Sequence, residues 1–175
     1  WRRRRGMAWH WRRVPCLSSS PADHQPEIVA QAGHCRGQDP GTTLVVSPDR
    51  GNAKTATQFS RLLCLPVAAG SKRRLSDDQV VIDAIVGDVR GKRAIVLDDE
   101  IATGGSIIEL LDRLAAQDCT SAALACTRGL FAGKAHQRLR DPPDVTAGLT
   151  PDPVPSPSPA SPACPVRPRD PPFAA

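Results

Sequence analysis

The sequence predicts an α/β fold in which a mostly parallel, twisted sheet is flanked by helices. Short apolar runs alternate with segments of helical period between residues 43 and 127, which is the pattern of βαβ units with a sheet covered on both faces. Polar residues directly follow three of the apolar runs, where parallel sheets bind their ligands. Basic residues and prolines concentrate at the two ends, so we expect the fold itself to occupy residues 41–141.

Five apolar runs predict the strands of this sheet. Each is short, rich in valine, isoleucine or alanine, and bounded by turn residues. In chain order they are TLVVS at 43–47, LPVAA at 65–69, QVVIDAIVGDV at 79–89, RAIVLDD at 93–99 and SAALACT at 121–127. The polar segment GSKRRLSDD at 70–78 separates the second from the third, and we expect it to be a loop.

Two segments predict helices. AKTATQFSRLLC at 53–64 places Phe59, Leu62 and Leu63 at helical spacing. SIIELLDRLAAQD at 106–118 has a continuous apolar face, which is the period of a helix packed on a sheet. That face consists of Ile107, Leu110, Leu111, Leu114 and Ala115.

The two ends of the chain differ from its centre in composition. Residues 1–15 contain six arginines and no acid, so the remaining residues account for −1 of the formal net charge of +5. Twelve of the eighteen prolines lie in residues 142–175, and a tract so rich in proline lacks the backbone donors of helices and sheets. We therefore expect an irregular basic extension at 1–40 and a disordered tail at 142–175. Both have the character of sequence from a frameshifted or fragmentary reading frame.

Composition also bears on the cellular setting. Six cysteines are scattered without a CxxC pair, which favours a reducing cytosol over a disulfide scaffold. Cys64 and Cys126 stand in apolar runs and are expected to be buried. No run has the length of a membrane span, and the basic start lacks the apolar stretch of a secretory signal. We expect a cytoplasmic protein with no membrane association and no specific nucleic-acid partner.

The stretch IVLDDEIATGGS at 95–106 carries the strongest chemical signal. Gly104 and Gly105 allow a tight turn, and Ser106 and Glu109 fit a capping box at the start of the following helix. Free N–H groups at a helix start attract phosphate. Asp98 and Asp99 precede the turn, where carboxylates can accept from sugar hydroxyls or hold Mg²⁺. The combination suits a phosphorylated sugar, whereas an ordinary strand–turn–helix connection needs no acidic pair.

This stretch resembles the ribose-phosphate loop of the type I phosphoribosyltransferase fold. VVSPDRGNAKTA and GSKRRLSDDQVV are similar to the pyrophosphate-side loop and the flexible catalytic loop of ribose-phosphate pyrophosphokinases. GDVRGKRAIVLDD and ACTRGLFAGKA follow in the family's order. The resemblance covers about residues 41–140. It implies transfer of pyrophosphate from ATP to ribose 5-phosphate with Mg²⁺, in a protein that assembles as a homo-oligomer.

The resemblance also implies roles for individual residues. Asp49 matches a position that helps hold Mg²⁺ of MgATP, Lys72 matches the catalytic lysine, and Arg74 matches a substrate-contacting arginine. Asp98 matches a contact to the ribose hydroxyls, with Asp99 beside it. The loop that grips the 5-phosphate corresponds to Ala102, Thr103, Gly104, Gly105 and Ser106.

The chain departs from the family pattern in three respects. Ala102 stands where the family often has aspartate, and Arg128 stands where it usually has histidine. The motifs of the family's N-terminal domain are not found in residues 1–40, so turnover by this chain alone is in doubt. Two alternatives therefore stay open: a phosphoribosyltransferase that uses PRPP, and a non-catalytic module that binds ribose phosphate or PRPP.

Overall fold

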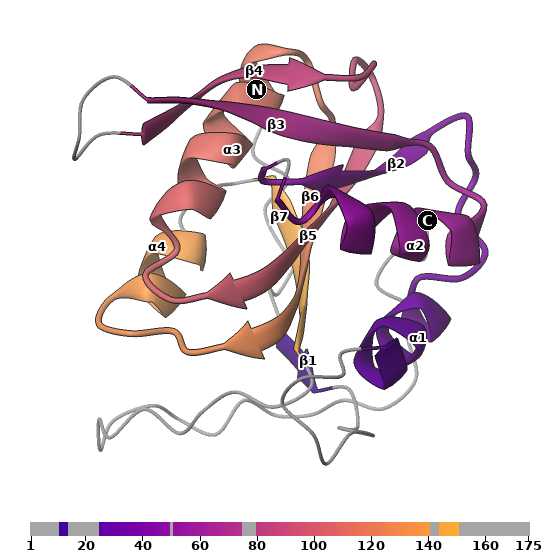
Figure 1. Cartoon of the computed structure of the whole chain (residues 1–175), viewed down its shortest axis with the longest axis horizontal. Coiled ribbons are helices and arrows are strands. Elements are labelled where there is room, and N and C mark those ends of the chain that lie inside the picture. Colours follow the sequence, from indigo (N-terminus) through magenta and orange to yellow (C-terminus); the bar gives the residue numbers. More distant parts are fainter. Residues whose placement is uncertain (1–10, 14–24, 50, 75–79, 141–143, 151–175) are drawn as a thin grey trace.

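The folded part of the chain is one seven-stranded sheet with helices on both faces (Figure 1). A computed structural model describes residues 11–13, 25–49, 51–74, 80–140 and 144–150. The strands are β1 (Trp11–Arg13), β2 (Thr43–Ser47), β3 (Val67–Arg74), β4 (Val80–Val86), β5 (Arg93–Ile101), β6 (Ser121–Gly129) and β7 (Val145–Thr150). The helices are α1 (Gln25–His34), α2 (Ala53–Leu63), α3 (Gly105–Ala116) and α4 (Ala135–Arg140).

The sheet is mostly parallel, as the sequence predicts. Its strand order is β1-β7-β6-β5-β2-β3-β4, and each neighbouring pair is parallel except β3 and β4. The central strands β2, β5 and β6 correspond to the apolar runs at 43–47, 93–99 and 121–127. Their carboxyl ends therefore point to the same edge of the sheet.

Among the described residues, no helix has the length and apolar character needed to cross a membrane.

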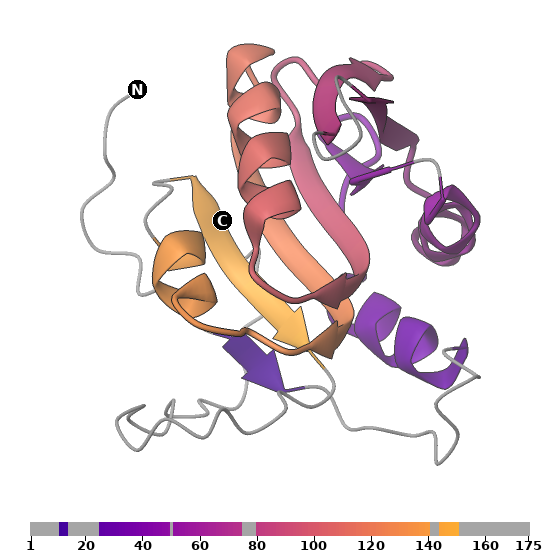
Figure 2. The ribbon, with the colours of Figure 1, turned by 60° about the vertical axis from the view of Figure 1, so that its left-hand side comes forward.

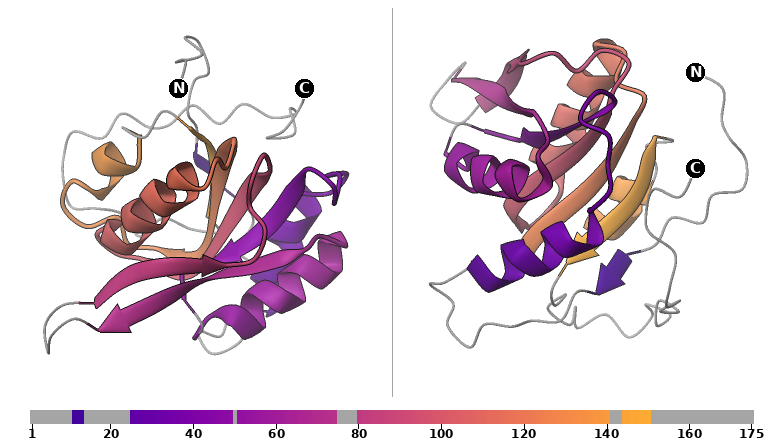
Figure 3. Two further views of the ribbon diagram at one scale, coloured as in Figure 1. Left: turned by 90° about the horizontal axis from the view of Figure 1, so that it is seen from above. Right: turned by 90° about the vertical axis from the view of Figure 1, so that its right-hand side faces the viewer.

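Alternate residues of each strand pack against different helices, because side chains of a strand point to opposite faces. Leu44 and Val46 belong to an apolar cluster that includes the buried face of α3 and residues of α4. Val45 belongs to the cluster on the other face, with Phe59 of α2 and Ile28 of α1. Figures 2 and 3 show the sheet between these two pairs of helices. The predicted apolar face of the second helix is confirmed by the burial of Ile107, Leu110, Leu111 and Leu114.

The fold extends beyond the predicted boundaries of 41–141, which are therefore too narrow. In α1, Ile28 and Ala32 are buried in the core, and the buried Gln31 donates from Nε2 to the carbonyl oxygen of Cys126 at 2.6 Å. Strand β7 pairs with β6 after residue 141. Both segments are short and lie near irregular sequence. Their hydrophobic pattern is therefore too short to predict a helix or a strand, and only their contacts with the sheet reveal them.

The segment 70–78 was expected to be a loop, but its first half continues strand β3. Ser71, Lys72 and Arg74 pair with β4 in an antiparallel hairpin that reaches past β2 (Figure 1). Polar side chains are compatible with this strand because β4 pairs with it from Ala69 to Arg74. Residues 75–79 lie outside the described part of the structure.

The two cysteines predicted to be buried differ. Cys126 is buried in β6, as expected. Cys64 is exposed, because it follows the last residue of α2 in the left-handed conformation, with φ of 56°. Its apolar neighbours in sequence belong to the end of α2 and the start of the next connection, and they do not enclose the thiol.

Candidate active site at the carboxyl edge of the sheet

The turn after β2 lies against strand β5 near the carboxyl edge of the sheet. Asn52 lies at the start of α2, and its buried side chain donates from Nδ2 to the carbonyl oxygen of Leu97 in β5 at 3.1 Å. The charge of Asp49 also acts on the carboxyl group of Asp98, the next residue of β5. The structure therefore brings the predicted residue Asp49 close to the predicted residue Asp98.

Asp49 is held in a tight turn between β2 and α2. Its Oδ1 accepts a hydrogen bond from the backbone N–H of Asn52 at 2.9 Å, and its carbonyl oxygen accepts one from Ser47 Oγ at 2.7 Å. Beside this turn, Gly70 of β3 lies so close to Pro48 that an added Cβ would be 2.5 Å from the Pro48 carbonyl oxygen. Glycine at 70 therefore lets β3 pass directly beside the Asp49 turn.

Asp98 and Asp99 form an acidic pair at the end of β5. The backbone N–H of Asp99 donates to Asp98 Oδ1 at 2.9 Å. Burial and the adjacent Asp99 carboxyl group, with a smaller contribution from the charge of Asp49, raise the pKa of Asp98 to about 7. Thr127 of β6 donates from Oγ1 to the carbonyl oxygen of Asp99 at 2.7 Å, which fixes the backbone beneath the pair. A bound cation or a hydroxyl donor would favour the ionised form of Asp98.

The predicted phosphate loop, Ala102–Ser106, makes a turn from β5 into α3. Gly104 has φ of 74°, a conformation that favours glycine, and it is the residue that precedes the first turn of the helix. No side chain caps this helix start, so its first N–H groups are left for solvent or a ligand. Thr103 and Ser106 are exposed, and Gly104 is buried.

The predicted capping box is wrong. The helix begins at Gly105 with Gly104 as its N-cap, two residues earlier than the box requires, and Ser106 makes no side-chain cap. Glu109 turns instead toward the sheet, where its Oε1 accepts the backbone N–H of Ile82 at 2.7 Å. The four-residue pattern describes a local contact, whereas the partner of Glu109 lies 27 residues away.

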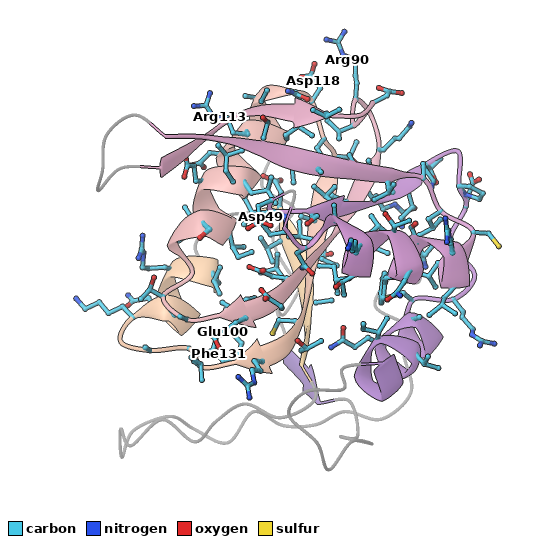
Figure 4. All side chains as sticks on the ribbon, in the orientation of Figure 1. Asp49, Arg90, Glu100, Arg113, Asp118 and Phe131 are labelled. Atoms are coloured by element: carbon cyan, nitrogen blue, oxygen red, sulfur yellow. The ribbon has the colours of Figure 1, made fainter. Side chains whose placement is uncertain are left out.

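The connection after β6 supports the phosphate loop, a role that the sequence does not reveal. Leu130 N and Phe131 N both donate to the carbonyl oxygen of Ile101, and Ala132 N donates to that of Ala102. Figure 4 labels Glu100 near the end of β5 and Phe131 in the connection after β6. The motif GLFAGKA is visible in the sequence, but these backbone contacts depend on the adjacency of β5 and β6.

Helix α4 adds a basic residue that the sequence does not single out. Arg138 is exposed, and its Nη1 donates to the carbonyl oxygen of Thr103 at 3.4 Å. Leu139 of the same helix packs against Gly104, since an added Cβ on Gly104 would lie 3.2 Å from Leu139 Cγ. A weak helical pattern of six residues gives no indication of this placement.

The predicted residues Lys72 and Arg74 have a described backbone in β3, but their side chains lie outside the described part of the structure. Opposite Lys72 in the hairpin stands Ile82. The departure at Arg128 lies on β6, exposed and opposite Glu100 in the sheet register.

Residues 28–152 match the family described as the phosphoribosyl transferase domain, so the chain belongs to this family. Among its relatives are proteins named ribose-phosphate pyrophosphokinase. One from Streptomyces coelicolor, which carries that name provisionally, is 46% identical over 152 residues, covering 87% of this chain and 48% of the relative. One from Clostridium acetobutylicum is 35% identical over 139 residues, covering 78% of this chain and 44% of the relative. The chain thus spans somewhat less than half the length of these relatives.

Solved structures agree with this family. The phosphoribosylpyrophosphate synthetase from Mycobacterium smegmatis matches with a TM-score of 0.58 and 28% identity, over 73% of this chain and 40% of that chain. A purine phosphoribosyltransferase from Pyrococcus horikoshii matches with a TM-score of 0.53 and 19% identity, over 69% of this chain and 77% of that chain. The second likeness shows the fold alone. Together the comparisons confirm the predicted fold class and the resemblance to ribose-phosphate pyrophosphokinases.

Proposed function

We propose that this chain provides the ribose-phosphate-binding part of a ribose-phosphate pyrophosphokinase. The reaction transfers pyrophosphate from ATP to the 1-hydroxyl group of ribose 5-phosphate and yields PRPP and AMP. The observation that carries the proposal is the turn Ala102–Ser106, which follows an acidic pair and opens an uncapped helix start. The names of the relatives support the same reaction.

The proposed binding mode follows from the chemistry of this turn. The N–H groups at the start of α3 would donate to the 5-phosphate, and the positive end of the helix dipole would stabilise its charge. Asp98 and Asp99 lie in β5, shortly before this turn, and their carboxyl groups would accept hydrogen bonds from the ribose hydroxyls. Leu139 packs against Gly104 and would keep the turn in the conformation that exposes these N–H groups.

The residues fit Mg²⁺ as the metal of the substrate complex. Mg²⁺ is usually held by one or two carboxylates together with substrate phosphates and water. Asp49 and Asp98 supply carboxylate oxygens that interact electrostatically, while the described residues contain no group of three or more ligating side chains. We therefore assign Asp49 to the metal, with the phosphates of ATP completing its surroundings. When bound, Mg²⁺ would neutralise phosphate charge.

Lys72 and Arg74 complete the proposed machinery. Phosphoryl-type transfer depends mainly on positioning and on cations around the phosphates. Strand β3 runs from Gly70, beside the Asp49 turn, to Lys72 and Arg74. We propose that Lys72 stabilises charge on the transferring pyrophosphoryl group and that Arg74 contacts the substrate.

Ligand binding is tested by isothermal titration of the chain with ribose 5-phosphate, with ribose as the matched control. We expect binding of ribose 5-phosphate and at least tenfold weaker binding of ribose, because the helix start recognises the phosphate. Equal affinities for the two sugars would contradict the assignment of the phosphate loop. Binding without turnover would leave the chain as a binding module.

Turnover is tested by AMP release from ATP and ribose 5-phosphate in the presence of Mg²⁺. Lys72→Ala is expected to lower kcat by roughly a hundredfold or more, as the loss of a charge-stabilising group does in other transfer reactions. Lys134→Ala serves as the control, because Lys134 is an exposed lysine on the connection before α4. An unchanged rate in Lys72→Ala would exclude the proposed role of Lys72. Pyrophosphate release from PRPP and a base would instead identify a phosphoribosyltransferase.

Two properties of the setting are also proposed. Cys35, Cys64 and Cys119 are free thiols in the described part of the chain, which supports a reducing, cytoplasmic location. We further propose that the protein acts as a homo-oligomer, which sedimentation velocity would test.

A further inference from the structure

Glu109 connects two parts of the candidate site that are distant in sequence. Its partly buried Oε1 accepts the backbone N–H of Ile82 at 2.7 Å. Glu109 lies in the second turn of α3, the helix that starts at the phosphate loop. Ile82 lies in β4, the strand that pairs with the proposed catalytic segment of β3. One hydrogen bond therefore joins the phosphate loop's helix to the catalytic hairpin.

The position of this bond within the hairpin gives it a specific consequence. Ser71 pairs with Ala84, and Lys72 pairs with Ile82, so β4 contains one additional residue, Asp83, at this point. A bulge of this kind disrupts the ladder and bends the strand. The Ile82 N–H is the donor taken by Glu109, and the residue across from it is Lys72. The side chain of Glu109 thus holds the backbone directly opposite the lysine.

The hydrogen bond between Glu109 and Ile82 lies beside a buried apolar contact between β4 and α3. Ile82 is 1% exposed and shares an apolar cluster with Ile107 and Leu110 of α3. Strand β4 is the last strand of the sheet, so β3 is its only neighbouring strand in the described fold. The apolar contacts hold β4 against the helix, and contacts of this kind are non-directional. A hydrogen bond to a carboxylate is directional and stronger than a neutral one, so it can fix the position of β4 along the helix.

We propose that Glu109 is a positioning residue that fixes the β3–β4 hairpin, and with it the Lys72 backbone, relative to the phosphate loop. The proposal rests on the function proposed above, because Lys72 and the turn Ala102–Ser106 must act on one substrate. Pyrophosphate transfer requires that the transferred group be placed within a fraction of an ångström, and misplacement has a large effect on the rate. Glu109 itself need not touch the substrate.

Backbone amide exchange tests the anchor without any need for activity. Glu109→Ala is expected to raise the exchange rate of the Ile82 amide about tenfold, with a smaller rise over residues 71–74, since one charge-assisted hydrogen bond is lost. Glu109→Gln keeps an acceptor oxygen and should give an intermediate rate. Asp112→Ala removes an exposed carboxylate from the same helix and should leave the rate unchanged. Equal Ile82 exchange in wild type and Glu109→Ala would overturn the anchor. If Glu109→Ala does not fold, Glu109→Gln against Asp112→Asn decides the same point.

Steady-state kinetics separate positioning from a purely structural role. Glu109→Ala should lower kcat about tenfold and leave KM for ribose 5-phosphate within about twofold, because the phosphate loop remains intact. Glu109→Gln should recover most of kcat. Faster Ile82 exchange with an unchanged kcat would show that the bond is structural only and overturn the positioning role. Absence of ribose 5-phosphate binding by the wild type would count against the proposed function, whereas amide exchange would still decide whether Glu109 holds the hairpin.

Discussion

Both ends of strand β5 pair with β6, but their charges and backbone groups are satisfied in different ways. At the amino end, the turns before β5 and β6 bind each other: Gly91 N donates to the carbonyl oxygen of Asp118, and Thr120 N and Thr120 Oγ1 both donate to that of Lys92. At the carboxyl end, β5 leads to an acidic pair and an uncapped helix start. Figure 4 shows Arg90 and Asp118 at the first end and Glu100 at the second.

The carboxyl groups at the two ends have pKa values shifted in opposite directions. Asp88 accepts a hydrogen bond from Lys92 Nζ at 3.0 Å, which lowers its pKa. Burial and a neighbouring acid raise the pKa of Asp98 to about 7. The amino end is thus electrostatically satisfied by the protein itself, whereas the carboxyl end gathers acids that a cation or a hydroxyl donor would stabilise. This contrast supports the proposed placement of the functional site at the carboxyl end, with structural support at the amino end.

The largest effect is expected from a pair of glycine substitutions at opposite ends of β5. Gly104 and Gly91 both have positive φ, of 74° and 69°, so alanine at either costs about 1 kcal/mol of backbone strain. An added Cβ at 104 also meets Leu139 at 3.2 Å, whereas one at 91 meets nothing within 4 Å. Gly104→Ala should therefore destabilise by about 2–4 kcal/mol in total and weaken ribose 5-phosphate binding at least tenfold.

Gly91→Ala is the matched control for this substitution. It should lower the free energy of unfolding by about 1 kcal/mol and leave ribose 5-phosphate affinity unchanged, as measured by urea unfolding and titration calorimetry. Equal losses of affinity in the two variants would mean that the conformation of the turn at Gly104 does not govern phosphate binding.

The second prediction concerns the dependence of stability on pH. Below about pH 4, Asp98 is protonated in both the folded and the unfolded chain. Between about pH 4 and 7 the unfolded chain ionises first, because the folded pKa is raised to about 7, so its contribution lowers stability as pH rises and levels off above 7. The shift corresponds to about 4 kcal/mol for a fully buried group, and solvent screening at the half-buried Asp98 reduces this. Asp98→Asn removes the decline and should therefore be more stable than wild type by about 2 kcal/mol at pH 8.

Urea unfolding of the metal-free protein from pH 4 to 8 measures this difference. Asp112→Asn is the control, since Asp112 is an exposed carboxyl group on α3, and its unfolding profile should follow that of the wild type. Parallel profiles for wild type and Asp98→Asn would contradict the raised pKa of Asp98.

The central part of the fold could be predicted because its signals are local. The apolar runs that form β2, β5 and β6 and the buried face of α3 follow from hydrophobic period alone. The contributions of Gln31, Leu139 and β7 could not, since each depends on a partner far along the chain. Gln31, for example, is a buried residue whose amide bonds the carbonyl oxygen of Cys126, 95 residues away.

The candidate site shows the same division. The acids and glycines of IVLDDEIATGGS predict a ribose-phosphate loop by their types and order, and this prediction needs no long-range information. Glu109 illustrates the limit: its spacing from Ser106 predicts a local cap, yet tertiary contact with Ile82 determines its conformation. Lys72 illustrates a second limit of the sequence. The basic residues around it suggest a loop, and only their pairing with β4 shows that they form a strand.

A smaller effect is expected from Arg138, at the functional end. Its guanidinium group donates to the carbonyl oxygen of Thr103 and places a positive charge beside the phosphate loop. Arg138→Ala should weaken ribose 5-phosphate binding about two- to fivefold, with little change in stability, because the contact is exposed and long. Arg113→Ala, an exposed arginine late in α3, is the control. Affinity losses of the same size in both variants would indicate a general charge effect and no specific role for Arg138.

The smallest effect is expected at the amino end, where the charges are already paired. Asp88 and Lys92 are four residues apart in sequence. The Asp88 side chain is 74% exposed, so solvent screens their attraction. Because the pKa of Asp88 is lowered, its stabilising contribution is present at neutral pH and is lost as pH falls through the folded pKa. Asp88→Asn should therefore reduce stability slightly at pH 7, lose this difference from wild type as pH falls through the folded pKa of Asp88, and leave ribose 5-phosphate affinity unchanged. A change of affinity in Asp88→Asn would show that the two ends of β5 are coupled, and the division between a supporting end and a functional end would then fail.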